Sequence, residues 1–272
     1  MKVKWFFIFL LLAGLLRANG SSAQSMSPYK VPEAYRFDYE VEQSLSHVGK
    51  TADTSVMHFF YTKSGDFAAA RISGKGHGAG NLFIVLTREG VSIIFDEHNK
   101  SITIISLRKM GSDLLGLTKW IRMDSLIAQM HKKSDGKGFQ SIKTGRTRQL
   151  GNYLSEEYGV TGRRGQKGFL WCTKVDFMTQ GDYILGAVGG NWLTMITNQQ
   201  AAHPLFQALT VPKTLVTDID IRDSTGARKI EMHTVGINPV STAISTNGYA
   251  VNDYSNMTLP EIFEAEMKKR NN

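Results

Sequence analysis

The stretch that most constrains the fold is residues 35–42, YRFDYEVE, in which apolar and charged side chains alternate without a break. Three aromatic residues and a valine occupy one set of positions, and charged residues occupy the other. Successive side chains of a β-strand point to opposite faces, so this period of two predicts a strand that is buried on one side. Such a strand must lie in a sheet that packs one face on a core.

Similar strand patterns follow at short intervals along the first half of the chain. We expect them at residues 57–61, 67–72, 82–86, 91–95 and 102–107. The sequences between them, KSGD, REG and EHNK, are rich in turn-forming residues. Closely spaced strands joined by short turns predict an antiparallel meander.

The pattern changes after residue 112. Ser112 could cap a helix from Asp113 to about His131, because apolar residues recur there at helical spacing. Trp120 and Met123 belong to this apolar stripe. The helix could cover an apolar sheet face that receives a ligand, or it could complete a dry core, which is the commoner use of such stripes.

The sheet is expected to resume near Phe139 and to continue to the C-terminal region. Strands are predicted within 153–160 and 168–175, followed by a hairpin of 215–221 with 230–234 and a last strand at 242–249. The hairpin alternation predicts that Leu215, Thr217, Ile219 and Ile221 share a face. A terminal helix follows, with Pro260 in its first turn.

The fold class predicted for residues 24–272 is a single α+β domain, mostly antiparallel β, with a C-terminal helix. Residues 1–23 are predicted to be a signal peptide, because Lys2 and Lys4 precede a short apolar run and small residues follow it up to Ala23. No later stretch is apolar enough over the length needed to cross a bilayer. The mature chain is therefore expected to be soluble and periplasmic or secreted.

Charge and cysteine content limit the possible partners. The whole chain has a formal net charge of +8, and Lys2, Lys4 and Arg17 of the leader account for three of these charges, which leaves +5. The remaining cations are spread over many positions, so no nucleic-acid-binding stripe is predicted. With one cysteine, Cys172, the chain cannot form an internal disulfide.

Cys172 is the first candidate for chemistry. In a strand from residue 169 to 175 it shares a face with Leu170 and Lys174, and no histidine lies near it in sequence. A nucleophilic cysteine requires a nearby base or a helix start that lowers its pKa. We therefore expect Cys172 to be a packed side chain.

The hairpin of residues 215–234 is the second candidate. If Arg222 lies across from Lys229, Asp220 meets Glu231 and Asp218 meets His233. Such a group could bind a hard cation in a metal-dependent hydrolase, or it could be a solvated face with cross-strand charge pairs. The second interpretation is favoured, because HExxH, CxxC and GxSxG motifs are all absent from the sequence. No catalytic residue, metal ligand or cofactor is predicted.

Residues 151–176 carry a family resemblance. The residues concerned are Gly151, Tyr153, Tyr158, Val160, Trp171 and Thr173. They resemble the G-Y-x-C-x-x-Y … W-x-T hairpin of an uncharacterised family of exported bacterial domains. That family is similar to the periplasmic lipoprotein carriers and receptors of the Lol type (LolA/LolB-like). The match departs from the pattern at Leu154, near the position where the family often has cysteine.

The resemblance implies a strongly curved, incomplete β-barrel packed around one or more helices, with an apolar concave side. We therefore expect a non-enzymatic periplasmic protein whose partner is a lipid, a lipoprotein acyl chain or another hydrophobic small molecule. The expected ligand-binding residues are Tyr39, Phe60, Ile94, Ile104, Trp120, Met123 and Trp171. The alternative is an envelope protein–protein interaction module that has no ligand cavity.

Overall fold

The computed structural model describes residues 29–47, 54–73, 82–107, 109, 140–162, 165–179, 181–183 and 211–271. The first six strands are β1 (Ala34–His47), β2 (Thr54–Tyr61), β3 (Phe67–Ser73), β4 (Leu82–Thr87), β5 (Val91–Asp96) and β6 (Ser101–Ser106). The others are β7 (Gln140–Leu150), β8 (Tyr153–Thr161), β9 (Lys167–Lys174), β10 (Thr214–Arg222), β11 (Arg228–Ser245) and β12 (Ala250–Asp253), followed by helix α7 (Leu259–Asn271).

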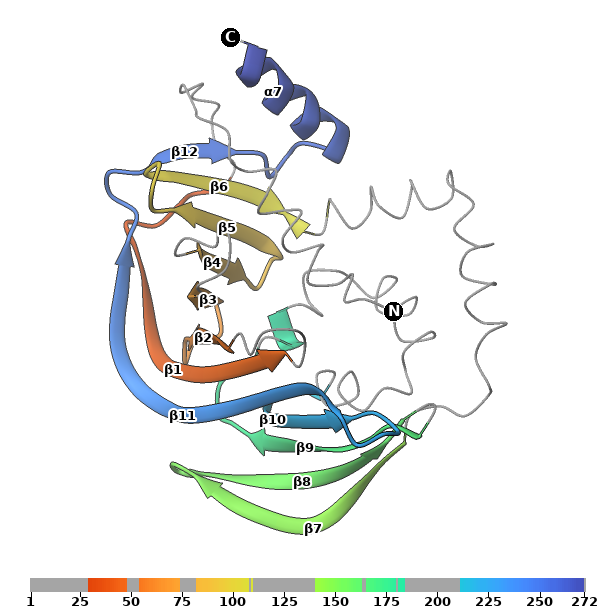
Figure 1. Ribbon diagram of the computed structural model, residues 1–272. Coiled ribbons are helices and arrows are strands. Elements are labelled where there is room, and N and C mark those ends of the chain that lie inside the picture. The colour runs from red at the N-terminus through yellow and green to blue at the C-terminus, as the bar shows by residue number, and fades with distance from the viewer. Residues whose placement is uncertain are drawn as a thin grey trace.

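All of these strands belong to one open sheet with the order β12-β6-β5-β4-β3-β2-β1-β11-β10-β9-β8-β7. Neighbouring strands are antiparallel except for the pair of β12 and β6. The predicted meander of short strands is therefore confirmed, and so is the mostly antiparallel β architecture. Figure 1 shows that the sheet is strongly curved and that β1 and β11 bend along their length.

Cross-strand partners divide the sheet into two faces. We call the face that carries Tyr39, Tyr61 and Leu170 the inner face, and the opposite face the outer face. Tyr183 lies in the helical turn at residues 181–183, which is inside the curve of the sheet (Figure 1), and it is buried against Tyr39 and Tyr61. Near Tyr39 and Tyr61 the inner face therefore points into the hollow of the sheet.

An aromatic core covers the outer face of β2–β6. Phe60, Phe83 and Phe95 extend from this face, and Tyr35 and Phe37 of β1 pack onto them. The second part of β1 pairs with β2. Because β1 bends, its first part, with Tyr35 and Phe37, packs over the outer face of β2–β6. Several rings meet edge to face, which is a favourable geometry for aromatic pairs.

Much of the inner face is apolar, although Lys143, Glu156 and Lys174 also lie on it. Buried residues on it form three clusters, which centre on Ile84 and Ile94, on Val41 and Tyr61, and on Leu170 with its neighbours on β10. Helix α7 covers the first cluster with Ile262 and Ala265. The segment after β9 covers the second, where Phe177 stacks on Tyr61 with ring centroids 4.8 Å apart.

Three details of the predicted strands are wrong. Residues 242–245 continue β11 and residues 246–249 form a turn, so there is no separate strand at 242–249. Arg222 lies across from Arg228 instead of Lys229, because the register shifts beside Ile221. A second shift, between Val216 and Asp218, places Leu215 and Ile219 on opposite faces, since one extra residue reverses the alternation.

Some predictions concern residues outside the described part of the chain. The expected helix from residue 113 to 131, with Trp120 and Met123, lies there, as does the predicted signal peptide. In the part that is described, no helix has the length and apolar character needed to cross a membrane.

Candidate functional site

A cavity of about 440 Å³ opens on the inner face where β8, β9 and the start of β10 lie side by side. The described residues that line it are Ser141, Leu154, Glu156, Tyr158, Leu170, Cys172, Thr173, Lys174, Val211 and Thr214. Most of the lining side chains come from alternate positions of β8 and β9, which point to the same face of a pleated sheet. The volume lies in the range typical of small-molecule sites.

Two titratable groups on the cavity wall have raised pKa values. Burial raises the pKa of the Cys172 thiol to about 11, and the nearby Glu156 carboxylate contributes to the rise. Burial and the same carboxylate also raise the pKa of the Tyr158 phenol. Both shifts favour the neutral form of the side chain, and Cys172 is partly buried against the cluster that contains Leu170.

Alkylation should reveal this state of Cys172. At pH 8 a thiol of pKa about 11 has roughly two hundredfold less thiolate than an unperturbed cysteine, although a more basic thiolate is intrinsically more reactive. We expect iodoacetamide to react at least about tenfold more slowly with the folded protein than with the urea-unfolded chain, and the rate to keep rising up to pH 10. A rate that levels off below pH 9 would contradict a raised pKa.

Three charged groups belong to the cavity or contact its lining. Glu156 accepts a hydrogen bond from Lys143 at 2.6 Å, and this contact lowers the pKa of the Glu156 carboxyl. Lys174 donates to the Pro212 carbonyl oxygen at 3.2 Å and to Thr214 Oγ1 at 2.9 Å. Neither of these acceptors is charged, so the described residues at the cavity edge form one ion pair and include one additional cation.

An acid–tyrosine cluster fastens the segment that leaves β9. Asp176 accepts hydrogen bonds from Tyr39 Oη at 3.0 Å and from Tyr153 Oη at 2.6 Å. The Tyr153 contact is the main cause of the lowered pKa of the Asp176 carboxyl. These bonds hold the segment next to Phe177, which packs on Tyr39 with ring centroids 4.6 Å apart.

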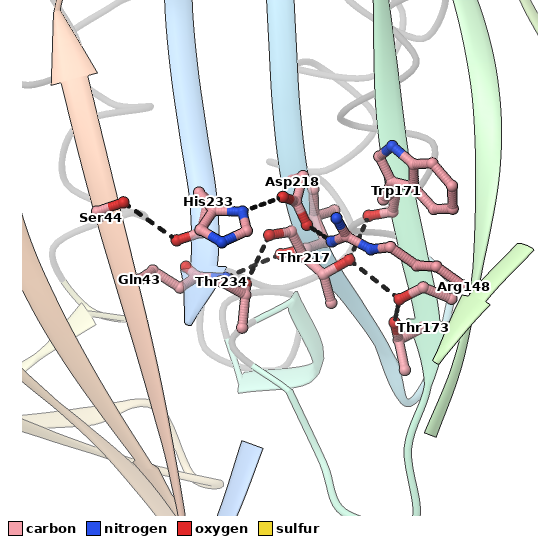
Figure 2. Close-up of polar contacts among 11 residues, drawn as sticks. Gln43, Ser44, Arg148, Trp171, Thr173, Thr217, Asp218, His233 and Thr234 are labelled. Atoms are coloured by element: carbon pink, nitrogen blue, oxygen red, sulfur yellow. Dashed lines mark hydrogen bonds and ion pairs between the residues drawn. The ribbon is translucent and has the colours of Figure 1, made fainter. Parts of the chain in front are cut away.

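The outer face of β7–β11 carries a different group of polar residues, shown in Figure 2. Asp218 accepts a hydrogen bond from Arg148 and lies 2.6 Å from His233 Nδ1. The Arg148 guanidinium also stacks over the Trp171 ring, 4.7 Å from its centroid. The predicted pairs of Asp218 with His233 and of Asp220 with Glu231 are confirmed.

This arrangement resembles a charged outer surface more than a metal centre. The Asp218 carboxylate forms an ion pair with the Arg148 guanidinium. Asp220 Oδ2 lies 3.1 Å from Arg222 Nη2. The described ranges of the chain contain no group of three or more His, Cys, Asp or Glu residues placed to hold a metal ion.

The expected ligand-binding residues do not meet at one place. Tyr39 and Ile94 are on the inner face, in separate clusters. Phe60 and Ile104 belong to the aromatic core of the outer face. Trp171 is on the outer face under Arg148. None of these five lines the cavity.

Sequence reasoning missed most of the cavity residues because apolar character alone does not tell the two faces of this sheet apart. One signal was present, since the alternation in β9 correctly grouped Leu170, Cys172 and Lys174 on one face. Leu154 and Tyr158 lie on the same face of β8. The register of β8 with β9 pairs Tyr158 with Leu170 and places both β8 residues next to this group. That register could not be read from the sequence.

Comparisons with known proteins add little. No model of a protein family matches the chain, and no curated protein matches its sequence. One solved structure, described as an uncharacterized conserved protein from Thermus thermophilus, is 7% identical, with 80% of this chain and 90% of that chain covered. The TM-score is 0.36, and at this level the similarity supports nothing about fold or function.

Proposed function

We propose that the protein is an exported, non-enzymatic binding protein of LolA/LolB-like architecture that holds a hydrophobic ligand, such as a lipid or a lipoprotein acyl chain, in the hollow of its sheet. The observation that carries the proposal is the cavity on the inner face of β8–β10, walled by Leu154, Tyr158, Leu170 and Cys172. The predicted signal peptide would bring the chain to the periplasm or outside the cell, where lipids are its neighbours.

The energetics suit an apolar ligand. Moving a methylene group from water into an apolar site contributes about 0.8 kcal/mol, so a fully buried chain of ten carbons contributes about 8 kcal/mol before the cost of association. Leu154 is 53% exposed, and its contact with an alkyl chain would remove that surface from water. No reacting group is needed for such a role.

Two matched variants test this function. Leu154→Glu places a charge at the cavity, whereas Ile142→Glu places one on the outer face of the neighbouring strand β7, where Ile142 is 70% exposed. Both positions are exposed, so both variants should fold. We expect native mass spectrometry of protein purified from the cell envelope to show a bound lipid in the wild type and in Ile142→Glu, and at least a tenfold lower occupancy in Leu154→Glu.

Repeated recovery of ligand-free wild-type protein, with no lipid in organic extracts, would contradict the proposal. Equal lipid occupancy in the two variants would also contradict the proposal, because binding of a lipid at another place would not depend on Leu154.

A second candidate function, an envelope interaction module, is favoured by one observation. β7 is the last strand in the order of the sheet, and its Ile142 side chain is largely exposed. The edge of a sheet can accept a strand from a partner protein. In that case the effects of the two variants would be reversed: Ile142→Glu would lose a co-purifying protein and Leu154→Glu would keep it.

A further inference from the structure

The cation at the edge of the cavity indicates what kind of ligand would fit. Lys174 lines the cavity together with Val211 and Thr214, and its ammonium group lies between the end of β9 and the start of β10. A lysine ammonium has three N–H donors. Two of them are directed to the Pro212 carbonyl oxygen and to Thr214 Oγ1. Both acceptors are neutral, so the positive charge is not compensated by them.

The other two charged side chains described at the cavity, Lys143 and Glu156, balance each other. Lys143 and Glu156 form an ion pair at 2.6 Å, and the Tyr158 hydroxyl also donates to Glu156, at 3.4 Å. Glu156 is therefore held by its own partners on the wall. Among the described residues of the cavity and its immediate edge, Lys143, Glu156 and Lys174 give a net charge of +1.

Electrostatic attraction is effective at this place. Lys174 and Cys172 lie on the same face of β9, so the ammonium group is at the edge of the cavity that the thiol lines. Apolar surroundings weaken solvent screening, so a cation beside the Leu170 and Cys172 wall attracts an anion more strongly than a fully solvated lysine does. The exposure of the lysine limits the effect, since salt screens a charge at the surface.

We propose that the ligand is a single-chain anionic amphiphile, whose carboxylate or phosphate head group binds Lys174 while its alkyl chain occupies the cavity between Leu154 and Leu170. This inference rests on the proposed function, because it assigns the head-group chemistry of the same site. Lys174 would hold the head group at the edge of the cavity, where water completes the solvation of the head group. The alkyl chain is the part of the ligand that would be buried.

A series of ligands with equal chains separates the two contributions. Decanoate, decyl phosphate, decanol and decyltrimethylammonium would be titrated into the purified protein by calorimetry, below their micellar concentrations. We expect both anions to bind roughly tenfold more tightly than decanol, which corresponds to about 1.4 kcal/mol, and the cation to bind more weakly than decanol. A preference for decanoate or for decyl phosphate would distinguish a fatty acid from a phosphorylated lipid.

Variants of the lysine test its role directly. Lys174→Met should remove the preference for anions over decanol, whereas Lys174→Arg should retain it. Lys167→Met is the matched control, because Lys167 is an exposed lysine at the other end of β9 and on its outer face. It should behave as the wild type does.

The possible outcomes distinguish the assignment of the anionic head group from the proposed function of hydrophobic ligand binding. Equal affinity of all four ligands, unaffected by Lys174→Met, would overturn the assignment of the head group and leave a hydrophobic binding protein. An anion preference that survives Lys174→Met would likewise overturn it. Failure of every ligand to bind would overturn the proposed function as well.

Discussion

Replacing Phe83 with alanine is expected to lower the free energy of unfolding by about 3–5 kcal/mol, the largest single effect predicted for this protein. Phe83 is 2% exposed, and its ring packs against Phe37, Phe60 and Phe95 with centroids 5.5–6.2 Å apart. Alanine would leave a cavity that these rings cannot fill, because they are already packed against one another. The loss is a large part of the roughly 5–15 kcal/mol typical of a folded domain.

Urea denaturation followed by circular dichroism would measure this change, and Phe169→Ala is the matched control. Phe169 is 43% exposed on the outer face of β9, where the Arg146 guanidinium lies 5.2 Å from its ring centroid. Removing it should cost about 1 kcal/mol or less. Similar costs for the two variants would mean that the aromatic core over β2–β6 does not carry the stability of the sheet.

Alanine at Gly168 is expected to be the next most damaging change, with a cost of about 3 kcal/mol. A Cβ at this position would overlap the carbonyl oxygen of Asp220 and lie 2.9 Å from Cα of Ile221. Both atoms belong to the backbone of β10, which cannot move away as a flexible side chain could. The added methyl group therefore forces β9 and β10 apart and disturbs the wall of the cavity.

Gly159→Ala is the control for this substitution, because Gly159 lies in the adjacent strand β8, across from Phe169. There the nearest atom to an added Cβ would be Thr144 Cγ2 at 3.5 Å, an ordinary contact. Alanine in a strand is about 0.5–1 kcal/mol better than glycine, so this variant should be neutral or slightly more stable. A Gly168→Ala protein with an unchanged urea midpoint would show that β10 adjusts without cost.

The strand content was predictable because the relevant signal is local. The alternation of residues 35–42 and the turn sequences of the first half depend on neighbours in sequence, and the structure confirms each of these strands to within a few residues at its ends. The same rule failed at Thr217, where the register shift on β10 breaks the alternation, because a bulge arises from pairing with a neighbouring strand.

The candidate site was much less predictable than the strands. Both faces of β2–β6 are apolar, so Phe60 and Ile94 look equivalent in sequence although they pack in different clusters on opposite sides. Trp171 was expected to contact a ligand because it is a large aromatic residue. Instead, its ring lies under Arg148, a residue of β7 that is far from it in sequence. Cys172 was expected to be a packed side chain because no histidine lies near it in sequence, and the structure shows it partly buried beside Leu170.

By itself, the sequence determined the period of the strands, their turns, the terminal helix and the grouping of Leu170, Cys172 and Lys174, since all of these follow from the geometry of one chain segment. The tertiary structure decided which apolar face is filled and which retains a cavity. That outcome depends on the bend of β1 and β11 and on the register of β8 with β9. Bend and register are set by packing between strands distant in sequence, and no local pattern encodes them.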